Sequence, residues 1–103
     1  MADNAWARAA KASDISEGGA VVFEAGDKKI AIFKSSGHFY AIDNTCPHRG
    51  GPLNEGYLEN FEVTCPWHAW SFDVRTGDCK SIPEFKITAY KTKIENDFVF
   101  VQL

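Results

Sequence analysis

The sequence lacks the features that would place it in several common classes of protein. Only three of its 103 residues are cysteine, an odd and small number that argues against a disulfide framework. No apolar run approaches the length of a membrane span, and the first residues, which include the acidic Asp3, contain no signal-peptide core. We therefore expect a cytoplasmic protein that has no membrane as a partner.

Basic charge is also scarce. Lys and Arg number 11 against 14 for Asp and Glu, which gives a net charge of −3, and they are scattered rather than gathered in a stripe. Proteins that bind nucleic acid usually carry such a stripe, so we expect no nucleic-acid partner. A protein partner with a basic face fits better. The length predicts a single domain, residues 1–103, with a small core.

Short apolar or alternating runs recur along the chain between residues that favour turns. The turn residues are Gly26-Asp27, Ser36-Gly37, Thr76-Gly77-Asp78 and Asn96-Asp97. The runs, which we predict to be strands, cover residues 20–25, 28–34, 38–43, 61–64, 70–74, 86–94 and 98–103. Residues 5–12 are rich in alanine, but the run is short and we predict a strand there too. The pattern is typical of an all-β, antiparallel fold.

Residues 44–57 differ from the rest because proline and glycine crowd into them, which predicts a shaped loop without regular structure. This stretch contains the first of two motifs that read alike. TCPHRGG places Cys46 two residues before His48, and TCPWHAW places Cys65 three residues before His68. Thiolate and imidazole are the usual ligands of zinc and of iron–sulfur centres. We predict that the two loops bring these four side chains around one metal centre.

The order of the ligands distinguishes the two kinds of centre. Structural zinc sites usually pair like with like, whereas each motif here carries one cysteine and one histidine. The mixed order suits a binuclear centre in which each loop supplies a cysteine to one iron and a histidine to the other. A zinc-stabilised interaction module remains an alternative, and colour separates the two, since iron–sulfur protein is brown-red and zinc protein colourless.

The motifs resemble the two ligand boxes of the Rieske [2Fe–2S] family. The likeness continues in GGPLNEG after the first box, in SFDVRTG after the second, and in Ile82-Pro83, which resembles the family's proline-containing loop. The resemblance covers nearly the whole chain. It implies a Rieske fold, an antiparallel β-sandwich or barrel with an inserted cluster-binding subdomain, about residues 44–83, that carries the two ligand loops.

The resemblance also implies one [2Fe–2S] cluster, with Cys46 and Cys65 on the inner iron and His48 and His68 on the outer iron. A [2Fe–2S] core of charge 2+ with two thiolates and two neutral imidazoles is uncharged when oxidised, so an added electron meets less repulsion than with four thiolates. Histidine ligation therefore raises the reduction potential.

The resemblance implies a soluble ferredoxin like those of aromatic-ring hydroxylating systems. Such a protein passes single electrons from a flavin-dependent NAD(P)H reductase to a terminal oxygenase by transient docking. The sequence contains no recognisable nucleophile, general acid or substrate pocket, and it is too short for the mononuclear iron domain of an oxygenase, so we expect no enzyme activity of its own. The small subunits of assimilatory nitrite reductases share the fold, and CPHRGGPL resembles some of them. Such a structural or regulatory subunit is the other alternative.

The sequence departs from the family at several positions. Rieske proteins of respiratory cytochrome bc complexes carry a disulfide and hydroxyl donors near the cluster, and the matching residues here are Gly51, Trp67, Trp70 and Phe72. Without those hydroxyls, we expect a potential towards the lower end of the family range of about −150 to +300 mV. Ala69 stands where the family usually has glycine, a substitution we expect to be tolerated.

Residues outside the motifs are expected to have ordinary structural roles. We expect Cys79 to be a small buried residue, His38 to be solvated and Trp6 to lie in the core. The acidic residues that we expect on a solvated face are Glu55, Glu59 and Glu62.

Overall fold

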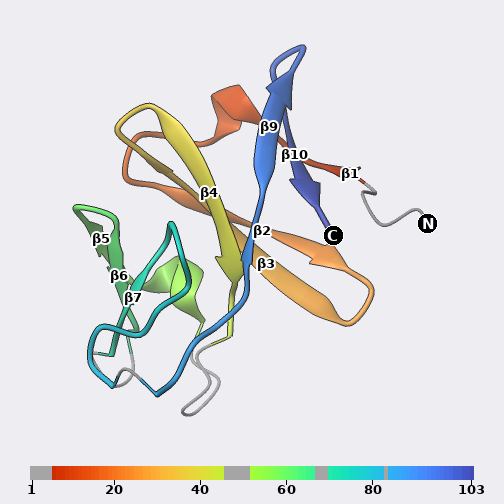
Figure 1. Ribbon diagram of the computed structural model, residues 1–103. Coiled ribbons are helices and arrows are strands. Elements are labelled where there is room, and N and C mark those ends of the chain that lie inside the picture. Colours follow the sequence, from red (N-terminus) through yellow and green to blue (C-terminus); the bar gives the residue numbers. More distant parts are fainter. Residues whose placement is uncertain (1–5, 46–51, 67–69, 83) are drawn as a thin grey trace.

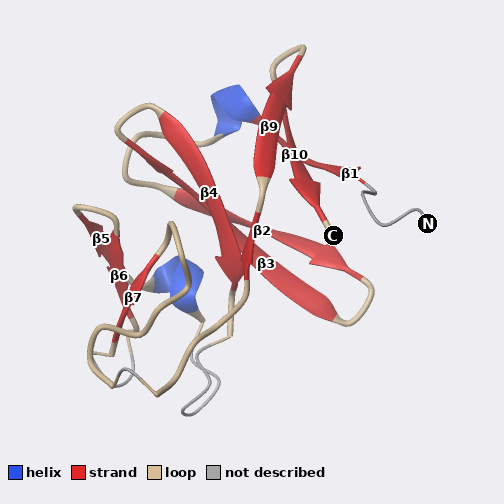
Figure 2. Cartoon of the chain, viewed as in Figure 1, coloured by secondary structure: helices blue, strands red, loops and turns tan. Residues whose placement is uncertain are grey.

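The computed structural model describes residues 6–45, 52–66, 70–82 and 84–103 of the chain. Within these ranges it contains β-strands and short 3-10 helices, and the paired strands are antiparallel, which confirms the predicted all-β class (Figure 2). The elements are β1 (Trp6–Lys11), η1 (Ala12–Asp14), β2 (Ala20–Ala25), β3 (Lys28–Ser35), β4 (His38–Asp43), η2 (Leu53–Glu55), β5 (Tyr57–Glu59), β6 (Glu62–Thr64), β7 (Ser71–Asp73), β8 (Ala89–Tyr90), β9 (Thr92–Glu95) and β10 (Phe98–Gln102).

The strands form three sheets. A three-stranded sheet has the order β1-β10-β9, a four-stranded sheet the order β2-β3-β4-β8, and a second three-stranded sheet the order β5-β6-β7. The β5-β6-β7 sheet is formed by chain that leaves the four-stranded sheet after β4 and returns to it at β8 (Figure 1). The segment with both cysteine–histidine motifs is therefore an excursion from the four-stranded sheet.

Strand β3 divides the hydrophobic interior into two clusters. Ile30 and Ile32 pack in one cluster with Val99 of the β1-β10-β9 sheet, whereas Ala31 and Phe33 pack in the other. Successive side chains of a strand point to opposite faces, so a strand buried on both faces needs a continuous apolar run. Residues 30–33 supply that run, which is why this segment lacks the alternation of a half-buried strand.

The structure corrects two of the predicted elements. Residues 86–94, predicted as one strand, form β8 and β9, which pair with β4 and β10 in different sheets. Residues 44–57 were predicted to be irregular, but Leu53–Glu55 forms η2 and Tyr57 begins β5. Leu53 is buried, and this burial explains why the chain turns compactly there.

The turn between β5 and β6 shows why sequence patterns missed β5. Asn60 and Phe61 have φ values of 51° and 71°, so a phenylalanine occupies the left-handed region that usually favours glycine. The Phe61 ring is held edge-on by Tyr40, at 5.7 Å between ring centroids, and lies under the Arg75 guanidinium at 4.5 Å. Tertiary packing therefore offsets a backbone conformation that the local sequence does not favour.

In the part of the chain that the structure describes, no helix has both the length and the apolar character needed to cross a bilayer.

Candidate metal centre

Of the four predicted ligands, the structure describes only Cys65. Cys46, His48 and His68 lie outside the described residues, and so do Gly51, Trp67, Ala69 and Pro83. Within the described ranges no group of three or more histidine, cysteine or carboxylate side chains could hold a metal ion. The convergence of the four ligands on one point therefore stays a prediction. The structure does describe the residues on either side of each ligand loop, which we call the stem of the loop, and the positions of the two stems bear on that prediction.

The second motif starts from a β-hairpin. Strands β6 and β7 pair with Val63 opposite Phe72 and Thr64 opposite Ser71. The Cys65 amide then donates a hydrogen bond of 2.7 Å to the Trp70 carbonyl. The backbone is therefore closed by a hydrogen bond between Cys65 and Trp70, and Cys65 is the last paired residue before the rest of the second motif.

The first motif also starts from a closed stem. Thr45 forms an isolated antiparallel bridge with Pro52, on either side of residues 46–51. One step further from the loop, the Leu53 amide donates to the Asn44 carbonyl at 2.7 Å and the Asn54 amide donates to the Asn44 side-chain oxygen, also at 2.7 Å. Both predicted ligand loops therefore leave from anchored backbone.

The two stems rest on the same hydrophobic cluster. Leu53 of η2 and Val63, Cys65 and Phe72 of the β6-β7 hairpin are all buried members of it. Figure 1 shows η2 beside the β5-β6-β7 sheet, on the same side of the four-stranded sheet. Two loops whose stems share one cluster are held near each other, as a shared metal centre requires.

The described cysteine fits a thiolate ligand. Cys65 is only 1% exposed and is not in a disulfide, and within the described ranges its Sγ atom makes no hydrogen bond. Cys79, the other free buried cysteine, differs because its Sγ atom accepts a hydrogen bond of 3.3 Å from the Ile82 amide. Of these two thiols, Cys65 is the one that lacks a protein partner in the described chain and stands at a loop stem.

Another loop, residues 79–85, is joined to the β6-β7 hairpin that carries the second motif. The Cys79 amide donates to the Phe85 carbonyl at 3.2 Å, and Cys79 pairs with Phe72 of β7. The Phe85 ring lies 5.2 Å from the Trp70 ring, between centroids. The prediction that Cys79 is a small buried residue is confirmed. Its Sγ atom also accepts the hydrogen bond from the Ile82 amide that connects two residues of this loop. Phe85 carried no sequence signal, because its contact with Trp70 depends on the fold.

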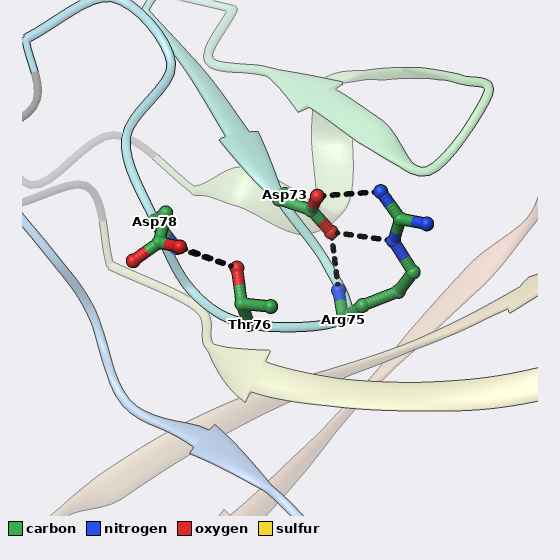
Figure 3. A network of polar contacts seen from close by, with 4 residues as sticks. All are labelled: Asp73, Arg75, Thr76 and Asp78. Atoms are coloured by element: carbon green, nitrogen blue, oxygen red, sulfur yellow. Dashed lines mark hydrogen bonds and ion pairs between the residues drawn. The ribbon is translucent and has the colours of Figure 1, made fainter.

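An ion pair braces the far end of the same hairpin. Asp73, at the end of β7, is buried, and its carboxylate accepts hydrogen bonds from Arg75 Nε at 3.0 Å, Nη2 at 2.8 Å and the Arg75 amide at 2.8 Å (Figure 3). Nearby, the Thr76 hydroxyl donates to Asp78 at 3.0 Å. The hydrogen bonds from Arg75 hold the pKa of the Asp73 carboxyl below its ordinary value of 3.8.

We expect Asp73→Asn to lower the free energy of unfolding by about 1–2 kcal/mol at pH 7, at the low end for hydrogen bonds to a charged group because the Arg75 side chain is 50% exposed. A lowered pKa means that this stabilisation is present above the ordinary pKa of 3.8 and is lost as the pH falls through the lower folded value. The difference between wild type and variant, measured by urea unfolding, should therefore shrink towards pH 2–3.

Asp78→Asn is the matched control, since Asp78 is exposed and its ion pair with Lys86 spans 3.6 Å. We expect it to change stability by less than about 1 kcal/mol. Equal losses for the two variants would contradict the importance of the buried Asp73 carboxylate.

Other predicted roles have mixed outcomes. His38 is exposed, as expected for a solvated histidine. Trp6 is half-buried and lies outside both clusters, with Lys93 Nζ 4.7 Å from its ring, so its assignment to the core was wrong. Glu55 and Glu59 are exposed, as expected, whereas Glu62 is half-buried.

The chain is similar to known proteins in both sequence and fold. Residues 5–91 match the family model described as the Rieske [2Fe-2S] domain. The chain is 39% identical over 99 residues, 95% of each chain, to the ferredoxin component of the naphthalene 1,2-dioxygenase/salicylate 5-hydroxylase systems of Ralstonia sp..

Solved structures with similar folds include a chain in the complex of reduced oxygenase and oxidised ferredoxin of carbazole 1,9a-dioxygenase. It is 27% identical, with a TM-score of 0.86, and the match covers 94% of this chain and 92% of that one. A protein assigned as the small subunit of an NADH-dependent nitrite reductase from Mycobacterium tuberculosis has a TM-score of 0.89, covering 97% and 96%. At 19% identity that likeness shows the fold alone.

Proposed function

The chain belongs to the Rieske [2Fe–2S] domain family, and from this premise we propose that it carries single electrons from a reductase to a terminal oxygenase. The observation that carries the proposal is 39% identity, over 95% of both chains, to a ferredoxin component of a dioxygenase system. The protein is thus an electron-transfer component of a multicomponent system and not an enzyme by itself. The likeness to a nitrite reductase subunit rests on fold alone and supports that alternative less.

The cofactor is one Rieske-type [2Fe–2S] cluster, and we propose Cys46, His48, Cys65 and His68 as its ligands. The buried Cys65 thiol and the two anchored stems on one hydrophobic cluster support this set. When bound, the cluster supplies the one-electron chemistry. The family assignment also favours iron over the zinc alternative.

We further propose that residues 1–103 form a single domain in which residues of about 44–83 make the cluster-binding subdomain. The β5-β6-β7 sheet, which leaves the four-stranded sheet after β4 and returns at β8, supports this division. A cytoplasmic location is likewise proposed, because relatives of this kind are ferredoxin components of oxygenase systems.

The proposed partners are a flavin-dependent NAD(P)H reductase and a terminal oxygenase, which the protein meets in turn by transient docking. The solved complex of an oxygenase with a similar ferredoxin supports the second partner. The net charge of −3 favours partners with basic docking faces and association that weakens at high salt.

The test is electron paramagnetic resonance of the dithionite-reduced protein together with a redox titration. We expect a signal of mixed histidine and thiolate ligation, one electron taken up per chain, and a potential towards the lower end of the family range of about −150 to +300 mV. The buried Phe72 side chain offers no hydroxyl to stabilise the reduced state.

Transfer to an oxygenase is then followed by stopped-flow absorbance, with the reductase and oxygenase of a naphthalene dioxygenase system as partners. A colourless, zinc-containing protein would overturn the proposal. So would stable co-purification with a sirohaem subunit.

A further inference from the structure

The end of strand β4 is the point where the first ligand loop begins, and Asn44 lies there. We propose that Asn44 is a positioning residue, whose buried side chain joins the two arms of this loop and thereby controls how firmly the cluster is held. The inference rests on the proposed function, because it assumes that Cys46, two residues further on, is a ligand.

Asn44 makes hydrogen bonds to both neighbouring elements. Its amide donates to the Lys29 carbonyl of β3 at 2.8 Å, and its carbonyl accepts from the Leu53 amide at 2.7 Å. Its side-chain oxygen accepts from the Asn54 amide at 2.7 Å. The residue that precedes the loop is thus joined to η2, which follows the loop, by one backbone and one side-chain hydrogen bond.

Asp43, the residue before Asn44, is hydrogen-bonded to a different part of the chain, Thr88 and Tyr90. The Asp43 carboxylate accepts hydrogen bonds from the Tyr90 hydroxyl at 2.7 Å and from the Thr88 amide at 3.2 Å, and the Asp43 amide donates to the Thr88 carbonyl at 3.0 Å. Asp43 therefore ties the incoming arm of the loop to β8, while Asn44 ties it to η2. With the incoming arm held from two sides, the hydrogen bond between the Asn44 side chain and the Asn54 amide acts together with the backbone bond from Leu53 to fix where the outgoing arm lies.

Burial makes this link strong and leaves one group to be explained. Asn44 is 6% exposed, so water cannot readily replace a lost hydrogen bond to the Asn54 amide. Within the described residues, the Asn44 side-chain nitrogen has no hydrogen-bond partner, although buried polar groups nearly always have one. The two atoms of the Asn44 carboxamide therefore differ in their contacts. The oxygen accepts a hydrogen bond from η2, and the nitrogen is a buried donor next to the start of the first ligand loop.

The experiment compares Asn44→Ala, Asn44→Asp and the control Asn54→Ala, each purified with its cluster. The readouts are iron and sulfide per folded chain, the rate of cluster loss to an iron chelator, and the reduction potential. Asn44→Ala removes the acceptor, and we expect about tenfold faster cluster loss, as for a buried amide left without its partner. Asn54→Ala keeps the backbone N–H donor, so its rate should match wild type.

Asn44→Asp keeps an oxygen acceptor in the same place but replaces the NH₂ donor with a negative charge. We expect the cluster to be retained at nearly the wild-type rate, with a lowered reduction potential because a nearby negative charge disfavours the added electron. The added charge would lower the potential whatever the wild-type side chain does, so the rate of cluster loss is the readout that tests the positioning role. Asn44→Asp that lost its cluster as fast as Asn44→Ala would refute that role.

A second variant keeps the test informative if Asn44→Ala does not fold. Asn54→Pro removes the N–H donor from the other side, and the first turn of a helix tolerates proline. We expect the same faster cluster loss. Wild-type rates in Asn44→Ala or in Asn54→Pro would overturn this inference while leaving the proposed function intact, whereas wild-type protein that never holds a cluster would overturn the proposed function itself.

Discussion

Cys65→Ala is expected to yield protein without the [2Fe–2S] cluster, the largest effect expected of any single substitution here. Removing one thiolate from a four-ligand set leaves an iron without its full coordination. The loss would appear as colourless protein, as iron and sulfide at background level, and as the absence of the electron paramagnetic resonance signal after reduction. The same loss is expected for His68→Ala.

Cys79→Ala is the matched control for Cys65→Ala. Both cysteines are free and buried, at 3% and 1% exposure, and both belong to the same hydrophobic cluster, so the packing lost on truncation is similar. The Cys79 Sγ atom already accepts a hydrogen bond from the Ile82 amide. We therefore expect Cys79→Ala to keep its cluster at the cost of some stability. A fully assembled cluster in Cys65→Ala, or its loss in Cys79→Ala alone, would contradict the ligand assignment.

Gly77→Ala is expected to lower the free energy of unfolding by at least about 3 kcal/mol. Gly77 has a φ of 84°, a conformation that costs an L-residue about 1–2 kcal/mol. A Cβ atom at this position would also lie 2.0 Å from the Ile87 carbonyl oxygen, far inside van der Waals contact. The backbone cannot easily move away, because the Gly77 amide donates a hydrogen bond to the Asp73 main-chain carbonyl and the Gly77 carbonyl accepts one from the Ile87 amide.

Gly37→Ala separates the two causes. Gly37 has a nearly equal φ of 78°, but a Cβ atom there would meet nothing within 4 Å. We expect a loss of only about 1–2 kcal/mol for this variant, the cost of the backbone conformation alone. Urea unfolding of both variants, with equal cluster loading so that ligand binding contributes alike, measures the difference. Equal losses would show that the contact with the Ile87 carbonyl is relieved without cost.

The strands from residue 20 to residue 43 could be predicted because their signals are local. Apolar runs and the Ser36-Gly37 turn, with φ values of 53° and 78°, are properties of neighbouring residues. The turn at Phe61 carries no such signal, since its left-handed backbone depends on packing against Tyr40 and Arg75. Strand β5, which precedes that turn, was missed for the same reason.

The division of residues 86–94 has a similar origin. No glycine, proline or other turn residue interrupts them, so the sequence was interpreted as one strand, although the alternation changes phase at the adjacent Ala89 and Tyr90. The structure pairs Ala89 with Ile42 of β4, and Thr92 with Val101 of β10, so the chain passes from one sheet to another within a few residues. Which strand accepts each residue is a question of tertiary arrangement, and periodicity holds no information about it.

By itself, the sequence determined the all-β class, the family and the kind of cofactor, because periodicity, turn residues and the spacing of cysteine and histidine are local properties of the chain. Only the tertiary structure decided that the Asn44 side chain reaches Asn54, and that, among the residues the structure describes, the Cys79 thiol and not the Cys65 thiol accepts a hydrogen bond. It also decided that both loop stems rest on one hydrophobic cluster. The physical reason is that hydrogen bonds and burial of this kind depend on which segments the fold brings together, and not on the residue types alone.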